Sequence, residues 1–178
     1  DRRLIHERIG RLKRELAEVE RHRDVIRAGR KKGSLKVAAL VGYSCAGKSS
    51  LENALTRSDI YEDDLLFSTL DTTTRVLDLP GKQELLLTDT VGFIRKLPHH
   101  LIEAFKGTLE EAKYADILIH VVDAAAPGMD ERMQVVYDTL RELEVKNKTV
   151  VTVFNKADKL EAPRTFRDFR ADYSVTLS

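Results

Sequence analysis

The first 28 residues carry a hydrophobic pattern that is typical of a helix. Five apolar positions are spaced four, three, four and three residues apart, and they are Ile5, Ile9, Leu12, Leu16 and Val19. This spacing places them on one helix face as a heptad seam. Gly29 and Gly33 then predict the end of the helix and a short linker. We therefore expect residues 1–33 to form a coiled-coil-like helical arm.

From residue 34 onward the pattern changes to short apolar runs that alternate with amphipathic stretches. The apolar runs predict buried strands at 34–42, 85–87, 117–122 and 148–154. Helical spacing predicts three helices at 49–56, 101–113 and 129–143. Pro80-Gly81 predicts a hairpin turn that adds one antiparallel edge strand. The alternation predicts an α/β domain over residues 34–178, with a doubly wound, mostly parallel six-stranded sheet.

The net charge of +1 hides a strong asymmetry along the chain. Residues 1–36 carry 13 Lys or Arg and 6 Asp or Glu, a charge of +7, so the remaining 142 residues carry −6. A basic segment joined to an acidic domain suggests two roles. The arm is either a helix that packs on a partner helix with a solvated outer face, or in addition a nucleic-acid contact through its basic face. These two interpretations are compatible.

Composition and cysteine content narrow the class of protein. Hydrophobic residues make up 42% of the 178 residues, which is enough for a core, whereas no apolar run reaches the roughly 18 residues of a membrane span. The single cysteine, Cys45, excludes an internal disulfide and any multi-cysteine metal site, and it favours a reducing, cytoplasmic setting. The chain opens on Asp1 directly inside the helical pattern, and we expect it to be a fragment.

The strand at 34–42 leads into a phosphate-binding pattern. Residues 42–49 read G-x-x-x-x-G-K-S, and a strand before and a helix after them provide the context that a P-loop requires. Glycines let the backbone wrap closely round phosphate, and the helix N-terminus adds partial positive charge. Lys48 is expected to reach the terminal phosphates, and Ser49 to offer its hydroxyl to Mg²⁺. The expected contacts are Gly42, Tyr43, Ser44, Cys45, Ala46, Gly47, Lys48, Ser49 and Ser50.

A second phosphate-side pattern follows the strand at 85–87. Its four residues have the D-x-x-G spacing and are Asp89, Thr90, Val91 and Gly92. Asp89, at the carboxyl end of its strand, is expected to hold Mg²⁺ through water. Gly92 is expected to bring its backbone N–H to a γ-phosphate, because no side chain blocks the approach.

The strand at 148–154 runs into a base-reading pattern. Its four residues have the N-K-x-D spacing and are Asn155, Lys156, Ala157 and Asp158. A carboxylate such as Asp158 accepts two hydrogen bonds from guanine, at N1–H and the 2-amino group, whereas adenine lacks both donors and would leave it unpaired. Asn155 is expected at N7, and the stem of Lys156 over the ring. The pattern therefore favours GTP over ATP.

The long acidic segment 59–77 is expected to act as a first switch. A threonine in it should close over Mg²⁺ when γ-phosphate is present and release it after hydrolysis. On chemistry alone the candidates are Thr69, Thr72, Thr73 and Thr74.

The second switch is expected at residues 89–100. Within it Phe93 directly follows Gly92, at the position where many GTPases carry a glutamine that orients the attacking water. Either hydrolysis is slow until a partner supplies the missing group, or the Phe93 side chain turns away and backbone and metal order the water. Two arginines could stabilise charge in the transition state, and they are Arg75 and Arg95. The two histidines His99 and His100 are instead expected to cap a helix or to lie in solvent.

Together these motifs resemble the HflX family of translational GTPases. The resemblance rests on "ALVGYSCAGKSSLENALT", "LFSTLDTTTR", "LLTDTVGFIRKLPHHLIEAFKGTLEEAKYADILIHVVDA" and "NKADKL", and it covers nearly the whole chain. It implies a P-loop GTPase that binds the large ribosomal subunit, is stimulated by the ribosome and splits stalled or idle ribosomes. Residues 1–28 would then be the end of an N-terminal domain.

The resemblance also assigns residues that spacing leaves open. It implies a switch I motif of Phe67, Ser68, Thr69, Leu70 and Asp71, in which Thr69 binds Mg²⁺, and it makes a hydrophobic residue at Phe93 a family feature. Ser178 would be the serine of a guanine-contacting S-A-K type loop, so that the domain is truncated at its C-terminus. The segment 160–173 is short for a helix and a loop, so either this connection is compact or residues are missing.

Cys45 departs from the family pattern. The family usually carries asparagine at this position, and in potassium-activated relatives its oxygen helps to hold K⁺ beside the phosphates. A thiol is a poor ligand for a hard cation, which prefers oxygen. We therefore expect weak or no stimulation by K⁺.

These observations lead to one expected function with alternatives. The chain is expected to bind GTP with Mg²⁺ and to hydrolyse it to GDP and phosphate. Its expected partner is the large ribosomal subunit with its rRNA, and its expected role is ribosome splitting or recycling under stress. We expect it to act as a monomer in the cytoplasm. The alternatives are a GTPase of ribosome assembly or tRNA modification, and a GTP-dependent binding module with negligible intrinsic hydrolysis. The expected catalytic residues are Lys48, Thr69 and Gly92, and the expected metal ligands are Ser49, Thr69 and Asp89.

Overall fold

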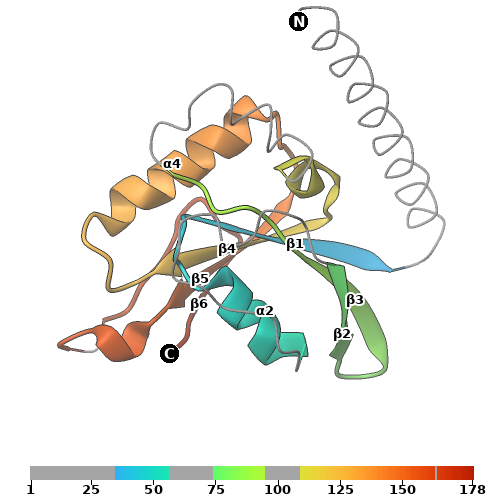
Figure 1. Ribbon diagram of the computed structural model, residues 1–178, viewed down its shortest axis with the longest axis horizontal. Coiled ribbons are helices and arrows are strands. Elements are labelled where there is room, and N and C mark those ends of the chain that lie inside the picture. The colour runs from blue at the N-terminus through green and yellow to red at the C-terminus, as the bar shows by residue number, and fades with distance from the viewer. Residues whose placement is uncertain (1–34, 57–73, 95–108, 163) are drawn as a thin grey trace, which may run out of the picture. The chain divides into compact units, whose positions relative to one another are not determined.

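The computed structural model describes residues 35–56, 74–94, 109–162 and 164–178 (Figure 1). The chain divides into two units, residues 1–35 and residues 36–178. The helical arm expected at 1–33 lies outside the described residues, so the arm and its boundary stay predictions.

The described unit is built on one six-stranded sheet with the strand order β2-β3-β1-β4-β5-β6. Within this sheet β2 and β3 pair antiparallel, through the hairpin that turns at Gly81, and every other neighbouring pair is parallel. This confirms the predicted doubly wound sheet with one antiparallel edge strand. The strands are β1 (Lys36–Gly42), β2 (Thr74–Leu79), β3 (Gln83–Asp89), β4 (Ile117–Asp123), β5 (Thr149–Asn155) and β6 (Tyr173–Thr176).

The helices lie on both faces of the sheet, with α2 (Lys48–Thr56) on one side and α4 (Met129–Glu142) on the other (Figure 1). Alternate residues of β1 explain this arrangement. Leu40 packs in the cluster that includes Leu51 of α2, whereas Val41 packs in the cluster that includes Val136 of α4. A strand buried on both faces is a continuous apolar run, as observed.

The helices predicted at 49–56 and 129–143 are therefore confirmed, and the helix predicted at 101–113 is described only as a helical stretch over residues 109–114. A short 3₁₀ turn, η1 (Ala157–Lys159), follows β5. None of the helices in the described ranges is long and apolar enough to cross a lipid bilayer.

Asp168 anchors the connection between β5 and β6, which contains η1 and no α-helix among its described residues. Asp168 is only 5% exposed, and its carboxylate accepts from three neighbouring residues. The Tyr137 hydroxyl donates over 2.6 Å and the Thr152 hydroxyl over 2.9 Å, while Arg170 donates from its backbone N and its Nε. The connection thus reaches β6 as a compact, anchored loop.

The carboxyl ends of the parallel strands meet at one edge of the sheet. Leu40 pairs with Asp89 across β1 and β3, and Asp123 pairs with Asn155 across β4 and β5. In open α/β sheets, ligands bind in the crevice beyond this edge. The fold therefore brings the phosphate-binding, D-x-x-G and N-K-x-D motifs to one place.

Candidate nucleotide-binding site

The loop between β1 and α2 has the backbone of a phosphate cradle. Gly47 adopts a left-handed φ of 91°, and a Cβ added there would collide with Asn155 Nδ2. The left-handed backbone favours glycine at this point. The loop leads directly into α2, and the N-terminus of a helix carries the positive end of its dipole. The loop can therefore hold an anion.

Lys48, the first residue of α2, is 7% exposed. Burial lowers the pKa of its ammonium because the charged form loses water, while Asp89 and Cys45 act in the opposite direction. A buried ammonium is costly unless an anion compensates it. The phosphates of a nucleotide would supply that compensation.

Ser49 and Asp89 lie across the loop from one another. The Ser49 hydroxyl donates to Asp89 Oδ2 over 2.9 Å, and Asp89 is 1% exposed. A hydroxyl beside a carboxylate at a phosphate loop is the hard oxygen donor set that Mg²⁺ prefers. The described residues therefore fit this metal, whereas the third expected ligand, Thr69, lies outside them.

The segment after Asp89 is hydrogen-bonded to β1. The Thr90 hydroxyl donates to the Leu40 carbonyl over 2.6 Å. A Cβ added to Gly92 would lie 2.8 Å from Ser44 Cα and 3.1 Å from Lys48 Nζ. Only glycine permits this approach, so the Gly92 backbone reaches the buried ammonium without an intervening side chain.

Phe93 is turned into the core. Its side chain is 2% exposed and belongs to the cluster that includes Leu109 and Ala112. Its backbone is held on both sides, because Phe93 N donates to the Gly42 carbonyl and Ser44 N donates to the Phe93 carbonyl. The ring is therefore packed in the core, a position that is compatible with both alternatives for the attacking water.

The base-reading residues are tied to the phosphate loop. Asn155 Nδ2 donates to the Ala46 carbonyl over 3.1 Å, and Lys156 Nζ donates to the Cys45 carbonyl over 2.7 Å. Asp158 in η1 is exposed. This side chain is therefore available to a base that approaches from solvent.

The end of β6 reaches the same motif. The N–H of Ala157 donates to the Leu177 carbonyl over 3.0 Å, and Leu177 N donates to the Phe154 carbonyl over 2.8 Å. The neighbouring Ser178 is exposed. The structure thus brings the serine expected in a guanine-contacting loop next to the N-K-x-D motif.

Asp123 is a site residue that sequence reasoning missed. Its Oδ2 accepts from Lys156 Nζ over 2.8 Å, and its Oδ1 accepts from the backbone N of Ala125. The Asp123 carboxylate thereby holds the Lys156 ammonium beside the phosphate loop. A usable signal was present, since Asp123 ends a buried strand just as Asn155 ends the next one.

Two residues that the sequence offered as candidates lie in β2: Thr74 as a possible Mg²⁺ ligand and Arg75 as a possible stabiliser of transition-state charge. Arg75 is directed to the P-loop helix, with its Nε 4.0 Å from Oε1 of Glu52, a residue of α2 whose side chain is fully buried. Thr74 begins β2, and its hydroxyl lies 3.0 Å from that of Thr88. Thr74 is therefore engaged in the sheet.

The remaining switch residues lie outside the described ranges, so their roles stay predictions. The contact that closes over Mg²⁺ is one of these roles. The residues are Phe67, Ser68, Thr69, Leu70, Asp71, Thr72, Thr73, Arg95, His99 and His100.

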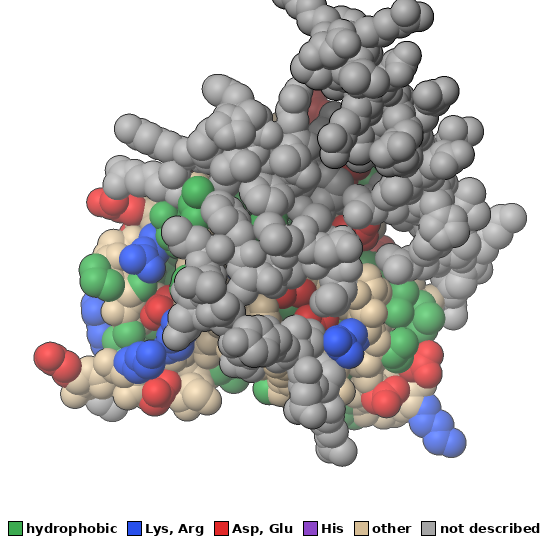
Figure 2. All heavy atoms as spheres, viewed as in Figure 1, with side chains coloured by type: hydrophobic (Ala, Val, Ile, Leu, Met, Phe, Trp, Pro, Cys, Tyr) green, Lys and Arg blue, Asp and Glu red, His purple; other side chains and the backbone are tan. Residues whose placement is uncertain are grey.

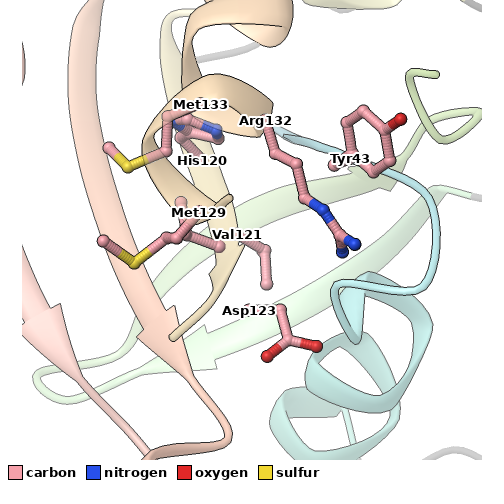
Figure 3. A pocket seen from close by; sticks show the side chains of 8 residues that line it. Tyr43, His120, Val121, Asp123, Met129, Arg132 and Met133 are labelled. Atoms are coloured by element: carbon pink, nitrogen blue, oxygen red, sulfur yellow. The ribbon is translucent and has the colours of Figure 1, made fainter. Parts of the chain in front are cut away.

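A small pocket lies beside the phosphate loop (Figure 3). The Arg132 guanidinium of α4 extends between Tyr43 and Asp123, with its Cζ 5.2 Å from the centre of the Tyr43 ring. The cavity has a volume of about 10 Å³, room for one water molecule at most. It is therefore a packing feature of the loop and not the nucleotide site.

Comparison with known proteins agrees with this geometry. Residues 37–156 match the family model described as "50S ribosome-binding GTPase". The GTPase HflX of Lacrimispora saccharolytica is 61% identical over 178 residues, 100% of this chain and 42% of that protein. The GTPase HflX of Escherichia coli is 44% identical over 170 residues, 94% of this chain and 40% of that protein. The chain thus spans about two fifths of the length of these relatives.

Solved structures show the same fold. A GTP-binding protein from Sulfolobus solfataricus, in complex with GDP, superposes with a TM-score of 0.62 at 26% identity, over 92% of this chain and 51% of that one. A variant of Era from Aquifex aeolicus, bound to GDP·AlF₄⁻, superposes with a TM-score of 0.54 at 27% identity, over 72% of this chain and 42% of that one. With its phosphate loop, its guanine motif and these relatives, the chain belongs to the ribosome-binding GTPases, and within them to the HflX family.

Proposed function

We propose that this chain binds GTP with Mg²⁺, hydrolyses it to GDP and phosphate, and does so as a timer on the large ribosomal subunit. The observation that carries the proposal is the connection of the two halves of the site. Asn155 and Lys156 donate to carbonyls of the phosphate loop, so the base-reading residues and the phosphate-binding residues form one unit. A ligand that has both guanine and phosphates fits this unit.

Each described group has a separate task in this proposal. The loop amides and Lys48 bind the terminal phosphates, the Gly92 N–H addresses the γ-phosphate, and Asp158 accepts from guanine. Mg²⁺, held by Ser49, Asp89 and the expected Thr69, would supply positive charge against the β- and γ-phosphates. The Lys48 ammonium is already desolvated, which strengthens its interaction with charge that develops on the phosphates.

The burial of Phe93 supports slow intrinsic hydrolysis. A ring in the core offers no hydrogen bond to the attacking water, and the Phe93 backbone is committed to Gly42 and Ser44. A partner that adds a group or reshapes this segment would raise the rate. The family description "50S ribosome-binding GTPase" supports the large ribosomal subunit as that partner. We extend this to ribosome splitting by a monomer in the cytoplasm.

Single-turnover GTP hydrolysis, with and without large ribosomal subunits, tests the proposal. The expected result is slow turnover alone and a clear acceleration with subunits. The Lys48→Ala variant should remain slow under both conditions, because it loses the phosphate-binding ammonium. If GTP persists unchanged with and without subunits while GTP still binds, the chain is the GTP-dependent binding module, an alternative that the buried Phe93 favours. Tighter binding of ATP than of GTP would overturn the guanine assignment.

A further inference from the structure

Arginines and aromatic residues alternate along the compact connection between β5 and β6. Residues 164–173 read RTFRDFRADY. Their cations lie over aromatic rings, with Arg164 Cζ 5.8 Å from the centre of the Phe166 ring and Arg167 Cζ 5.3 Å from that of Phe169. We call residues 164–173 the arginine–aromatic loop. This loop lies outside the phosphate-binding motifs and outside the guanine motif.

Phe169 is the most exposed large hydrophobic side chain among the described residues, at 87%. Phe166, three residues earlier, is instead stacked on Phe154 of β5, with 5.0 Å between ring centres. The two phenylalanines therefore have different roles: one secures the loop to the sheet and the other is presented to solvent. Tyr173, at the start of β6, is a second aromatic residue with 64% exposure.

The charged side chains of the arginine–aromatic loop differ in how far they are exposed to solvent. Asp168 is buried and accepts from Tyr137 and Thr152, whereas Asp172 is exposed and its Oδ2 accepts from Val150 N. Arg170 is also engaged, with Gln134 and with the Tyr137 ring at 4.2 Å, whereas Arg164 and Arg167 are exposed. The exposed charged residues of the loop are three arginines and Asp172, so its exposed charge is positive, although the domain as a whole is acidic.

The anchoring of Asp168 makes the loop a preorganised surface. Burial would raise the pKa of this carboxyl, but hydrogen bonds from Tyr137, the Arg170 backbone, Thr152 and the Arg170 side chain outweigh it, so the pKa is lowered and the carboxylate stays ionised. A loop fixed at its centre loses little further conformational entropy when its exposed residues bind a ligand. The exposed ring and the outward arginines therefore act from a fixed backbone.

We propose that the arginine–aromatic loop binds unpaired RNA, with a base stacked on Phe169 and backbone phosphates at Arg164 and Arg167. Sequence-tolerant recognition of single strands combines aromatic platforms with cations, and arginine adds cation–π contacts. On the face shown in Figure 2, Lys and Arg side chains are interspersed with Asp and Glu among the described residues. The inference deepens the proposed ribosomal role and rests on it for the choice of RNA as the anionic partner.

Anisotropy titrations of the full 178-residue chain with a labelled single-stranded RNA of about 12 nucleotides test the loop. Phe169→Leu keeps an apolar side chain but removes the ring, and should weaken binding by about fivefold or more. Phe169→Trp keeps a ring and should retain affinity. Arg167→Ala should weaken binding to all sequences alike and lower the salt slope by about one. The basic arm is present in every variant, so its contribution cancels in the comparison.

Matched controls separate the loop from a general change of surface. Val76→Ala removes an apolar side chain that is 51% exposed on β2, and Lys82→Ala removes a cation at the β2–β3 turn. Both should bind as the unaltered chain does, with thermal unfolding unchanged in all variants because the altered side chains are exposed. A 2-aminopurine base in the RNA should be quenched by the unaltered chain and by Phe169→Trp, but much less by Phe169→Leu.

Equal RNA affinity and equal quenching for Phe169→Leu and the controls would overturn the proposal. Loss of binding to anionic lipid vesicles in Phe169→Leu, without loss of RNA binding, would assign the loop to a membrane surface instead. GTP hydrolysis, measured on the same variants, separates the proposed GTPase function from the proposed RNA binding by the loop. A chain that shows no GTP turnover with large subunits, yet loses RNA binding in Phe169→Leu, would refute the proposed function and support the loop.

Discussion

Cys45 lies in the phosphate loop with a left-handed φ of 61° and an exposed side chain. Left-handed backbone is uncommon for residues other than glycine, and asparagine is among the few enriched there. The asparagine that the family usually carries would therefore suit the same backbone. Cysteine keeps the shape of the loop but removes an oxygen donor from the edge of the phosphate site.

This residue gives the first prediction, which concerns monovalent cations. The unaltered chain should hydrolyse GTP at equal rates in KCl and NaCl, because a thiol is a poor ligand for K⁺. Cys45→Asn should gain a several-fold advantage in KCl. The measurement is turnover at matched ionic strength in the two salts. A several-fold K⁺ advantage of the unaltered chain would contradict this prediction.

Phe93 illustrates what a single position leaves undecided. The sequence places a hydrophobic residue after Gly92, and two consequences follow equally from that fact. The position of the Phe93 ring depends on Val41, Leu109 and Val136, which belong to the same core cluster and come from distant parts of the chain. Such a cluster is formed by the assembled layers and is not encoded in the local pattern.

At the scale of elements, His120 marks the contact between β4 and α4. It is 1% exposed, and its ring meets the Tyr137 ring edge-on at 5.1 Å. Its Nδ1 has no hydrogen-bond partner among the described residues. Burial lowers the pKa of His120 to about 4, with Arg170 and Lys48 adding to the shift and Asp168 opposing it. The imidazole is therefore neutral in the folded protein at neutral pH.

The second prediction is a loss of stability in mild acid. Between pH 6.5 and about 4 the unfolded chain binds a proton at His120 that the folded chain does not, so the free energy of unfolding falls as pH falls through this window. The expected loss is about 2 kcal/mol between roughly pH 7 and pH 5. His120→Phe keeps a ring against Tyr137 and should remove most of this loss. Urea unfolding at both pH values measures it, and an equal pH dependence in the two proteins would refute the assignment to His120.

The connection between β5 and β6 is the second feature at this scale. Asp168 secures this connection, because its carboxylate joins α4, β5 and the loop through Tyr137, Thr152 and Arg170. The sequence indicated that the segment was short, but not which residue secured it. That role depends on burial, which the identity of one of two aspartates in an arginine-rich stretch does not reveal.

The third prediction follows from this anchor. Asp168→Ala leaves the hydroxyls of Tyr137 and Thr152 without their acceptor and should lower the free energy of unfolding by about 2–4 kcal/mol. Asp138→Ala removes a half-exposed ion pair with Arg141 on α4 and should cost at most about 0.5 kcal/mol. Urea denaturation of both variants measures the difference. Equal stability of the two would show that the anchor contributes little.

At the scale of the whole molecule, the site joins the ends of β1, β3, β4 and β5 to one loop. Lys156 lies in the middle of this arrangement, since its Nζ donates to the Cys45 carbonyl and to Asp123. The left-handed backbone of Lys156, with φ of 61°, turns the guanine motif toward the phosphate loop. We therefore predict that binding of the base and binding of the phosphates are coupled through the Lys156 ammonium.

The fourth prediction tests this coupling. Asp123→Asn weakens the hold on Lys156 and should raise the Kd for GDP by roughly tenfold, about 1.5 kcal/mol. Asp138→Asn makes the same chemical change on α4, outside the nucleotide site, and should leave the Kd unchanged. Titration with a fluorescent GDP analogue measures both. A Kd for Asp123→Asn equal to that of the control would show that Lys156 does not depend on Asp123.

The local sequence determined the motifs and the layers of this protein. Each motif is contiguous in the sequence, so it can be recognised locally. The alternation of apolar runs with amphipathic helices specifies which residues must be buried. The sheet, the hairpin and the position of Asp89 and Asn155 at strand ends could therefore be predicted. Only the tertiary structure decided the roles of Asp123, Asp168 and the Phe93 ring. The side-chain partners of the two aspartates lie up to 33 residues away on other elements, and burial and hydrogen bonding between such groups arise only when the sheet and helices have packed.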